Sequence, residues 1–573
     1  MVIPPSRRPL LVAALLALGG TLVYLNALPN AFHFDDSHSI VENPAIRSFG
    51  EAGRWFTDTR AFTVLKENTN YRPVLLATYA VNYALGGLRP AGFRVFNLLG
   101  HLGCALLAFL LARELAARLW PEPRDARRRE WVPVLTGAVF VLHPLQSEIV
   151  NYISSRSDGL CALFYLASLL AWVRANAAAG RRALLLRAVA VAAFALALLV
   201  KEVGLTLPAA VWLWEVLVER RPAVRLGWRR LGRYAALAVV AGLYLAVRAY
   251  MLRDYDVRFR ATTPPLAYFA TQLRAWFHYL RLFVLPVGQC VDPDYPFSRS
   301  LVEPRVLAAA AGVIGVAAGA WPLRRRRPEV TFGLGFFLLA LAPTSSFFPI
   351  AEAVNEHRPY LGNLGLCLLA AVLLAEVAPR AAGRRGAAAL AAAVLLVLGG
   401  LTVARNRVWR DDYSLWRDVV AKAPHNGRAH LNYGLALLGR GRPDEALAQY
   451  EACARLWPDY SYCYINRSVL YRQRKEWDRA LADLDRAGRL TPGLFWVPYF
   501  RGVTWEEMGR PADAERAFAR TLAVSPSFLE ARFRRARVLA ALGRTDEARA
   551  EAGRAAARGH HEAARLAASL AGR

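Results

Sequence analysis

Residues 10–36 read LLVAALLALGGTLVYLNALPNAFHFDD, an apolar run followed by two adjacent carboxylates. The apolar part, residues 10–28, is long enough to cross a bilayer as a helix, because about 20 apolar residues span the hydrocarbon core. Arg7 and Arg8 precede it, as basic residues precede the apolar core of a signal peptide. The length of the run and the many apolar runs after it favour an uncleaved first membrane helix.

Further apolar runs predict an all-α, polytopic membrane domain of about eleven spans in residues 1–404. The other expected spans are residues 93–113, 131–147, 159–174, 183–200, 203–218, 234–251, 305–321, 331–349, 360–378 and 386–404. Residues 266–289 are also apolar, but Arg274, His278 and Arg281 recur there on one helical face. We expect this segment to be a re-entrant or interfacial helix.

The sidedness of the spans follows from the short Arg-rich loops, because cytoplasmic loops carry an excess of Lys and Arg. If the N-terminus is cytoplasmic and successive spans alternate in direction, all the short Arg-rich loops lie on the cytoplasmic side. They are residues 113–129, 174–187, 220–233, 324–327 and 380–385. An odd number of spans then places the first loop and the C-terminal region outside. Together with the Arg-rich composition, this predicts an integral protein of a bacterial inner membrane.

The overall composition excludes an ordinary soluble enzyme and a disordered scaffold. Hydrophobic residues make up 55% of the chain, and its mean hydropathy is +0.22. The net charge of +29 is compatible with nucleic-acid binding, but only four of the 73 basic residues are Lys, and much of the charge lies between the spans. We therefore expect membrane lipid, and no nucleic acid, as a partner.

From about Asn426 a period of 34 residues replaces the apolar runs. It recurs in three sets of positions: Pro424, Pro458, Pro492 and Pro526; Ala446, Ala480, Ala514 and Ala548; and the small residues Gly434, Ser468, Gly502 and Ala536. Small residues where two helices touch, and a Pro that closes the second helix, are typical of tetratricopeptide repeats. We expect an interfacial linker at 405–426, an α-solenoid of four repeats at 427–562 and a tail at 563–573.

The six cysteines show no CxxC spacing, so neither a zinc site nor a thioredoxin-type motif is indicated. Cys453 and Cys463 lie close together in the repeats and could pair in an oxidising compartment. We favour the alternative that they are two packed small apolar residues.

Ionisable residues collect on the expected outer loops, where they are functional candidates because charge is costly at a membrane. Asp35 and Asp36, which we expect to be exposed, could supply a general base; the alternative is a helix N-cap. The remaining candidates are Arg72, His143, Glu148, Arg156, Asp158, Lys201, Glu202, Glu356, His357, Arg358 and Tyr360. Arg358 could hold a phosphate in bidentate fashion or contact lipid headgroups, and Lys201-Glu202 could be an ion pair at a hairpin tip. Such a set suits an anionic lipid headgroup better than an ion pore.

The order and sidedness of these motifs resemble the transmembrane-and-tetratricopeptide O-mannosyltransferases, in the C-type (GT-C) superfamily of membrane glycosyltransferases. The resemblance is carried by Phe34-Asp35-Asp36, Asn70-Tyr71-Arg72-Pro73, His143-Pro144 with Glu148, Arg156-Ser157-Asp158, Lys201-Glu202 and Glu356-His357-Arg358-Pro359-Tyr360, followed by the repeats. It implies a polyprenyl-phosphate-linked, mannose-like sugar as donor, bound from the extracytoplasmic face. It also implies a first-loop acid as base and an inverting transfer to Ser or Thr of a protein. This chain differs in having only about four repeats and a bacterial-looking composition.

On this interpretation Asp35 or Asp36 accepts the proton of the acceptor hydroxyl, and Arg358, Arg72 or Lys201 stabilises the leaving phosphate. The repeats bind the protein or peptide acceptor in their groove. The spacing of the residues predicts no metal cluster, and the superfamily leaves a divalent metal open. Two rival hypotheses are a non-catalytic, membrane-anchored repeat scaffold for envelope assembly and a glycan polymerase or ligase.

Overall fold

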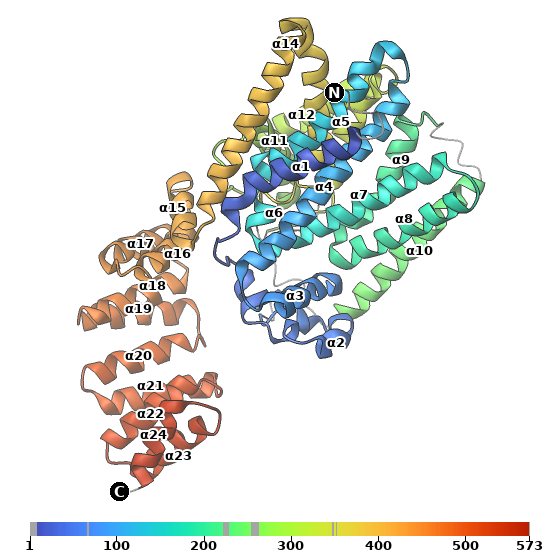
Figure 1. Ribbon diagram of the computed structural model, residues 1–573. Helices are drawn as coiled ribbons and strands as arrows, with labels where there is room; N and C mark the ends of the chain where they lie inside the picture. The colour runs from blue at the N-terminus through green and yellow to red at the C-terminus, as the bar shows by residue number, and fades with distance from the viewer. Residues whose placement is uncertain are drawn as a thin grey trace. The chain divides into compact units, whose positions relative to one another are not determined.

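The computed structural model describes residues 8–65, 68–221, 228–253, 263–346, 349–350 and 352–571, and these contain helices and turns but no strand. The chain divides into two compact units, Met1–Leu415 and Trp416–Arg573 (Figure 1). The predicted all-α class is confirmed. Arg7, at the expected cytoplasmic end of the first span, and residues 222–227, in one expected Arg-rich loop, lie outside the described residues.

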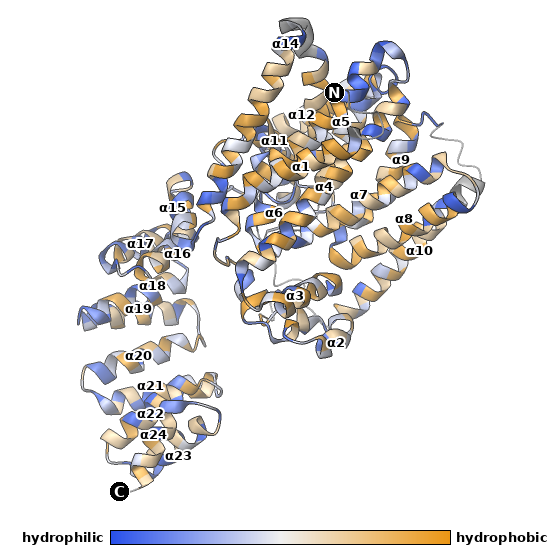
Figure 2. Ribbon diagram, in the orientation of Figure 1, coloured by the Kyte–Doolittle hydropathy of each residue, from blue (hydrophilic) through white to orange (hydrophobic). Residues whose placement is uncertain are grey.

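The first unit is a bundle of apolar helices that enclose one large core. Its helices are α1 (Arg8–Tyr24), α2 (Ala52–Thr57), α3 (Pro73–Gly86), α4 (Pro90–Leu119), α5 (Ala126–Leu142), α6 (Glu148–Asn151), α7 (Arg156–Ala177), α8 (Gly180–Val200), α9 (Leu207–Leu217), α10 (Trp228–Met251), α11 (Pro265–Val284), α12 (Pro304–Arg326), α13 (Pro328–Leu341) and α14 (Asn363–Val408). Figure 2 shows hydrophobic residues along most of α7, α8 and α10, with hydrophilic residues gathered at helix ends and loops.

Within the described residues, seven helices are long and apolar enough to cross a membrane, and α5 with α6 forms an eighth candidate bent by 57°. The expected spans at 203–218, 331–349 and 360–378 coincide with shorter helices: α9, α13 and the first part of α14. The helix α14 is interrupted at Gly383, whose φ of 68° lies in the left-handed region. The count of eleven spans therefore stays a prediction.

The uncertain segment at 266–289 contains one uninterrupted helix, α11. Its Arg274 donates hydrogen bonds to the carbonyl of Pro296 and to Ser298, so the polar face predicted from the sequence is directed to neighbouring chain. Ala270 and Leu273 of the same helix pack against Val306 and Ala309 of α12. Whether α11 lies in the interface remains a prediction.

The second unit consists of paired helices with the predicted period. They are α15 (Asp412–Lys422), which begins in the first unit, α16 (Gly427–Leu438), α17 (Pro443–Leu456), α18 (Ser461–Gln473), α19 (Trp477–Leu490), α20 (Trp496–Glu507), α21 (Pro511–Val524), α22 (Leu529–Ala541), α23 (Thr545–Ala556) and α24 (His561–Ala571). Each repeat pairs two antiparallel helices and buries its apolar face against its neighbours.

The small residues of the period lie where the two helices of a repeat meet. A Cβ on Gly502 would approach Cε1 of Phe518 to 2.6 Å, and one on Gly434 would overlap the ring of Tyr450. In both repeats a glycine therefore faces an aromatic ring sixteen residues later. In the second repeat the same two positions hold Ser468 and Leu484, and in the fourth they hold two alanines, so a bulkier first residue accompanies a smaller second one.

Cys453 and Cys463 form a disulfide between α17 and α18, with Cα atoms 5.7 Å apart. The favoured expectation of two unbonded cysteines was therefore wrong. The packing that the two helices share brings the buried side chains close enough to bond, which the ten-residue spacing alone did not decide.

Candidate functional site

The Asp35 carboxyl group lies at the surface, where the loop after α1 turns into a short π-helical segment, Ser37–Val41. Its side chain is 58% exposed, and Oδ1 lies 3.1 Å from Nε2 of His38. The other ring nitrogen of His38 lies 2.7 Å from Oγ1 of Thr63, so the ring is held from both sides. A second hydrogen bond to Asp35 comes from the side chain of Tyr152. These contacts orient one carboxylate oxygen in an otherwise accessible group.

The pKa of Asp35 lies below its ordinary value. Surrounding protein atoms alone raise it, but hydrogen bonding and charge interaction with His38, the bond from Tyr152 and the charge of His357 together lower it by more. The carboxylate is therefore ionised at neutral pH and able to accept a proton from a substrate.

The neighbouring Asp36 has a different environment, and the expectation that it is exposed was wrong. Its side chain is fully buried and accepts hydrogen bonds from the amide and hydroxyl of Ser154, at 2.8 and 2.6 Å, and from the amide of His33 at 3.1 Å. It also makes no N-cap hydrogen bond to the segment it precedes. Burial raises the pKa of Asp36 despite these bonds. Asp36 joins the loop to the segment before α7 and has no open path to a substrate.

Two charge pairs from distant parts of the chain are connected to Asp35 through His357. His357 Nδ1 lies 2.7 Å from Oε1 of Glu148, and Lys201 Nζ donates to both oxygens of Asp158 at 2.7 Å. The His357 ring is near both Asp35 and Asp158. Four of the expected site residues, from three loops, thus form a cluster that meets the exposed acid through His357. The second Glu148 oxygen is buried with no hydrogen-bond partner in the described residues, so it can take one from a ligand.

A further acid, Glu202, is flanked by two guanidinium groups. Arg72 lies 3.8 Å and Arg248 3.9 Å from its Oε2. Although burial raises the pKa of Glu202, the charges of Arg72, Arg248 and Lys201 lower it to about 2. Within the described residues the Nε of Arg72 is buried without a hydrogen-bond partner. Of the expected phosphate-binding cations, Arg72 has the most unused donor capacity.

Three expected site residues instead fill structural positions. Arg156 is buried, donates to Asn97 and to the carbonyls of Thr78 and Phe93, and stacks on aromatic rings. The ring of His143 stacks on Phe283, with both nitrogens bonded to backbone. The buried Tyr360 hydroxyl lies 2.8 Å from His101. Packing, rather than ligand binding, accounts for their polar atoms.

The remaining two candidates are also engaged by the protein. Glu356 is buried and accepts from the amide of Cys290, from Gln289 and from Arg405. Arg358 directs its two terminal nitrogens to the carbonyls of Glu352 and Ala353, at 2.8 and 3.0 Å. The geometry therefore does not favour Arg358 as a bidentate phosphate ligand.

Sequence reasoning missed His38 and Arg248 as parts of this cluster. His38 follows Asp35 by three residues, a spacing that brings side chains together on a helical turn. Arg248 is a basic residue near the end of an expected apolar span, which is itself a signal of function. In the described residues no three His, Cys, Asp or Glu side chains gather in a way that could hold a metal ion.

Comparison with known proteins bears on both units. Residues 414–461, 434–494 and 506–565 match the family model described as Tetratricopeptide repeat. Human protein O-mannosyl-transferase TMTC4 is 26% identical over 501 residues, which cover 78% of this chain and 66% of that protein. Human protein O-mannosyl-transferase TMTC1 is 25% identical, covering 82% and 59%, and protein O-mannosyl-transferase F38B6.6 of Caenorhabditis elegans is 24% identical, covering 76% and 61%.

The chain spans about two thirds or less of the length of these three relatives. Among solved structures, the crystal structure of MamA aligns with a TM-score of 0.24 at 21% identity, covering 26% of this chain and 88% of that one. The chain is a relative of the TMTC-type protein O-mannosyl-transferases, as its motifs predicted, and it carries tetratricopeptide repeats in its second unit.

Proposed function

We propose that the chain is a membrane glycosyltransferase that moves mannose from a polyprenyl-phosphate donor to Ser or Thr of a protein, with inversion, on the extracytoplasmic face. The observation that carries the proposal is the exposed, ionised Asp35, which is held by His38 and lies near His357. His357 is also near the Asp158–Lys201 pair, and Arg72 acts on both Asp158 and Glu202, so the charged groups form one continuous cluster. The names of the relatives support protein mannosylation. The disulfide in the repeats supports an oxidising, extracytoplasmic compartment.

In this mechanism Asp35 accepts the proton of the acceptor hydroxyl as the oxygen attacks the anomeric carbon. The bond from that carbon to the phosphate oxygen breaks, and the phosphate leaves with the electron pair. Arg72, supported by Arg248 and Lys201, stabilises the negative charge that develops there. Asp36 is buried and acts as a structural hydrogen-bond acceptor. Of the two predicted general bases, Asp35 is therefore the one proposed.

The repeats are the proposed acceptor platform. Stacked helix pairs form an extended groove suited to an unfolded or extended peptide. Because only a short segment of chain joins α14 to the repeats, an acceptor bound by the repeats is tethered to the first unit, which raises its effective concentration there.

The test is transfer by the full chain in nanodiscs, with radiolabelled polyprenyl-phosphate mannose as donor and the extracytoplasmic protein fraction of the source cells as acceptor. Label should enter protein and be released by β-elimination. Asp35→Asn should reduce transfer at least 100-fold with unchanged donor binding. Its matched control is Glu42→Gln, an exposed carboxylate of the same loop, which should transfer like wild type.

The phosphate role is tested separately. Arg72→Gln should raise the donor KM about tenfold or more, whereas Arg60→Gln, an exposed arginine of the same loop, should not. Full activity of Asp35→Asn would exclude Asp35 as the base. A lack of label in protein, with label in a lipid or glycan, would favour a polymerase or ligase instead.

A further inference from the structure

His33 ties the loop after α1 to the chain that follows α14. Its Nε2 lies 2.7 Å from the carbonyl oxygen of Trp409, and its Nδ1 lies 2.8 Å from Oδ1 of Asp412, the first residue of α15. The amide of Ala31 also donates to the carbonyl of Arg410 at 3.0 Å. The His33 side chain is fully buried, whereas that of Asp412 is 61% exposed.

Both partners of the His33 ring are hydrogen-bond acceptors. A backbone carbonyl can only accept, and so can an ionised carboxylate. A neutral imidazole carries hydrogen on one nitrogen and therefore satisfies only one of the two contacts. Holding both requires one additional proton, shared between His33 and Asp412. Loss of that proton leaves a nitrogen lone pair facing an oxygen.

Further charged groups lie near His33. Asp412 is in contact with the ring, and the buried carboxylate of Asp36 is close enough to interact with its charge. Arg94 lies near Asp36 and donates to two backbone carbonyls of the same loop, and the Arg410–Asp411 ion pair lies in the segment that His33 contacts.

The residue between His33 and Asp35 is held in a strained conformation. Phe34 has a φ of 48°, in the left-handed region that a bulky side chain rarely adopts. Its ring contacts those of Tyr152 and Trp409, with centroids 5.6 and 6.2 Å away. Such strain persists only where surrounding contacts enforce it. The direction of the Asp35 carboxylate therefore depends on the contacts that hold this turn.

We propose that His33 is a positioning residue, which holds the turn at Phe34 and thereby aims Asp35 at the acceptor for as long as the proton shared with Asp412 is present. The proposal rests on the proposed function, in which Asp35 is the base. When the shared proton is lost, the loop detaches from α15, and transfer falls while donor binding persists.

Asp412→Asn separates this role from a merely structural one. The Asn amide can present its oxygen to a protonated Nδ1 or its NH₂ group to an unprotonated one, so both contacts survive in either state. Because the side chain is largely exposed, the substitution has little effect on folding. Asp418→Asn, in the same helix, removes a charge without touching His33 and is the matched control.

The first measurement is hydrogen exchange of the full chain in nanodiscs at pH 5.5 and 8.5, corrected for the intrinsic pH dependence of exchange. In wild type and Asp418→Asn, protection of the peptide covering residues 31–39 should fall at least tenfold at the higher pH. In Asp412→Asn it should change less than twofold, and in His33→Gln it should be low throughout. Equal behaviour of wild type and Asp412→Asn would overturn the proposal, whatever reaction the protein catalyses.

The second measurement is transfer from radiolabelled polyprenyl-phosphate mannose over the same pH range. Asp412→Asn should keep its kcat at pH 8.5, where wild type loses about tenfold, and His33→Gln should lower kcat with the donor KM within twofold. A wild-type kcat for His33→Gln would contradict the positioning role. If Asp35→Asn is also fully active, the base is wrongly assigned, and hydrogen exchange alone decides whether His33 holds the loop.

Discussion

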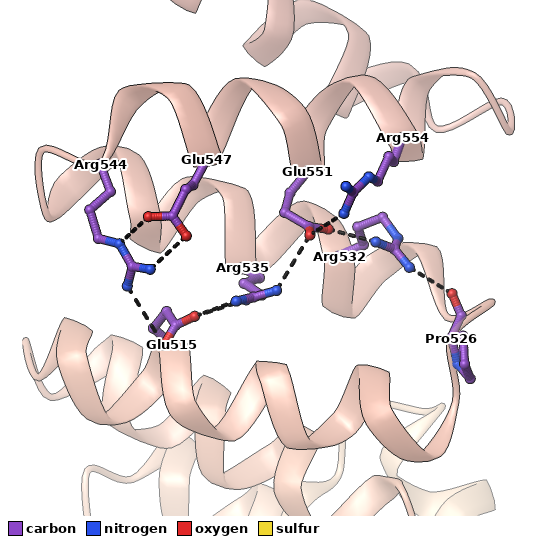
Figure 3. A network of polar contacts seen from close by, with 8 residues as sticks. All are labelled: Glu515, Pro526, Arg532, Arg535, Arg544, Glu547, Glu551 and Arg554. Carbon is purple, nitrogen blue, oxygen red and sulfur yellow. Dashed lines mark hydrogen bonds and ion pairs between the residues drawn. The ribbon is translucent and has the colours of Figure 1, made fainter.

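In the repeat unit, Arg535 of α22 reaches Glu515 of α21 at 2.7 Å and Glu551 of α23 at 3.3 Å, partners only 20 and 16 residues away. Figure 3 shows this network, in which the carboxylates meet guanidinium groups from the same helix, from a neighbouring helix or from Arg544 just before α23. In the first unit, by contrast, His357 meets Glu148 across 209 residues, and the second Glu148 oxygen is buried with no hydrogen-bond partner among the described residues. Within the described residues, a buried guanidinium Nε lacks a hydrogen bond in both units, as on Arg72 and Arg532, whereas the buried carboxylate oxygens that lack one, such as those of Glu148 and Glu202, lie in the first unit. Charged groups in the repeats thus meet partners in adjacent helices, whereas those of the candidate site come from distant loops and leave carboxylate oxygens without a hydrogen-bond partner.

This difference reflects what each unit must do. A solenoid is stable when every helix pair is complete with its neighbours, so its polar contacts follow the repeat. A site that stabilises charge on a reacting group needs donors fixed by the fold but not already neutralised. Three predictions test how far the comparison holds.

The largest effect is expected from Asp36→Ala, which removes a buried carboxylate and leaves three donors unsatisfied. We expect a loss of about 3 kcal/mol or more, because the nearby Arg94 charge also loses its counterion. Asp35→Asn, at an exposed position, should lose less than about 1 kcal/mol. Thermal unfolding followed by a thiol-reactive dye measures this, since the four buried thiols all lie in the first unit: Cys104, Cys161, Cys290 and Cys367. Equal unfolding temperatures for Asp36→Ala and Asp35→Asn would contradict the assignment of Asp36 as a buried structural group and Asp35 as an exposed one.

In the repeats, the largest expected loss comes from packing rather than charge. Gly502→Ala places a Cβ against Phe518 and should destabilise the third repeat by about 2 kcal/mol. Hydrogen exchange of peptides from α20 and α21 measures it. Adding Phe518→Leu, the residue type at position 484, should restore most of the protection. If the double variant exchanges as fast as Gly502→Ala alone, the sizes of residues 502 and 518 are not matched to each other.

The smallest effect concerns Glu202, whose pKa is lowered in the folded protein to about 2. A lowered carboxyl pKa contributes stability that is present above the unfolded value of about 4.5 and is lost as the pH falls toward 2. Since the side chain is one-third exposed, we expect Glu202→Gln to lose about 1–2 kcal/mol at pH 7 and less at pH 3. The dye assay at both pH values provides the measurement. If wild type and Glu202→Gln differ in stability by the same amount at both pH values, the arginines do not act on Glu202 through its charge.

Sequence reasoning succeeded where the pattern repeats and where it grouped residues from separate loops. The 34-residue period located the helix pairs, and grouping the outer loops brought together Asp35, Glu148, Asp158, Lys201 and His357. It could not separate Asp35 from Asp36, because adjacent residues have opposite exposure only once the turn at Phe34 is known. Sequence reasoning likewise could not show that Arg156 and Tyr360 are buried and hydrogen-bonded within the protein, since burial depends on neighbours far away in sequence.

The disulfide was misjudged for a related reason. Two cysteines ten residues apart are compatible with bonding and with simple packing, and only the arrangement of α17 and α18 decides between them. Local spacing predicts which elements form, and tertiary contacts decide the chemistry of individual side chains.

Across the repeats, a larger side chain at the first contact position accompanies a smaller one at the second. This coupling limits how the number and sequence of the repeats can change in evolution. Glycine with phenylalanine, and serine with leucine, are alternative solutions to the same volume, held sixteen residues apart within a single repeat. Duplication or deletion of a whole 34-residue unit carries both partners along and preserves the fit. Exchange of a shorter segment separates them and creates either a void or a clash. The array is therefore free to change in length by complete units, while each unit evolves as one inherited block.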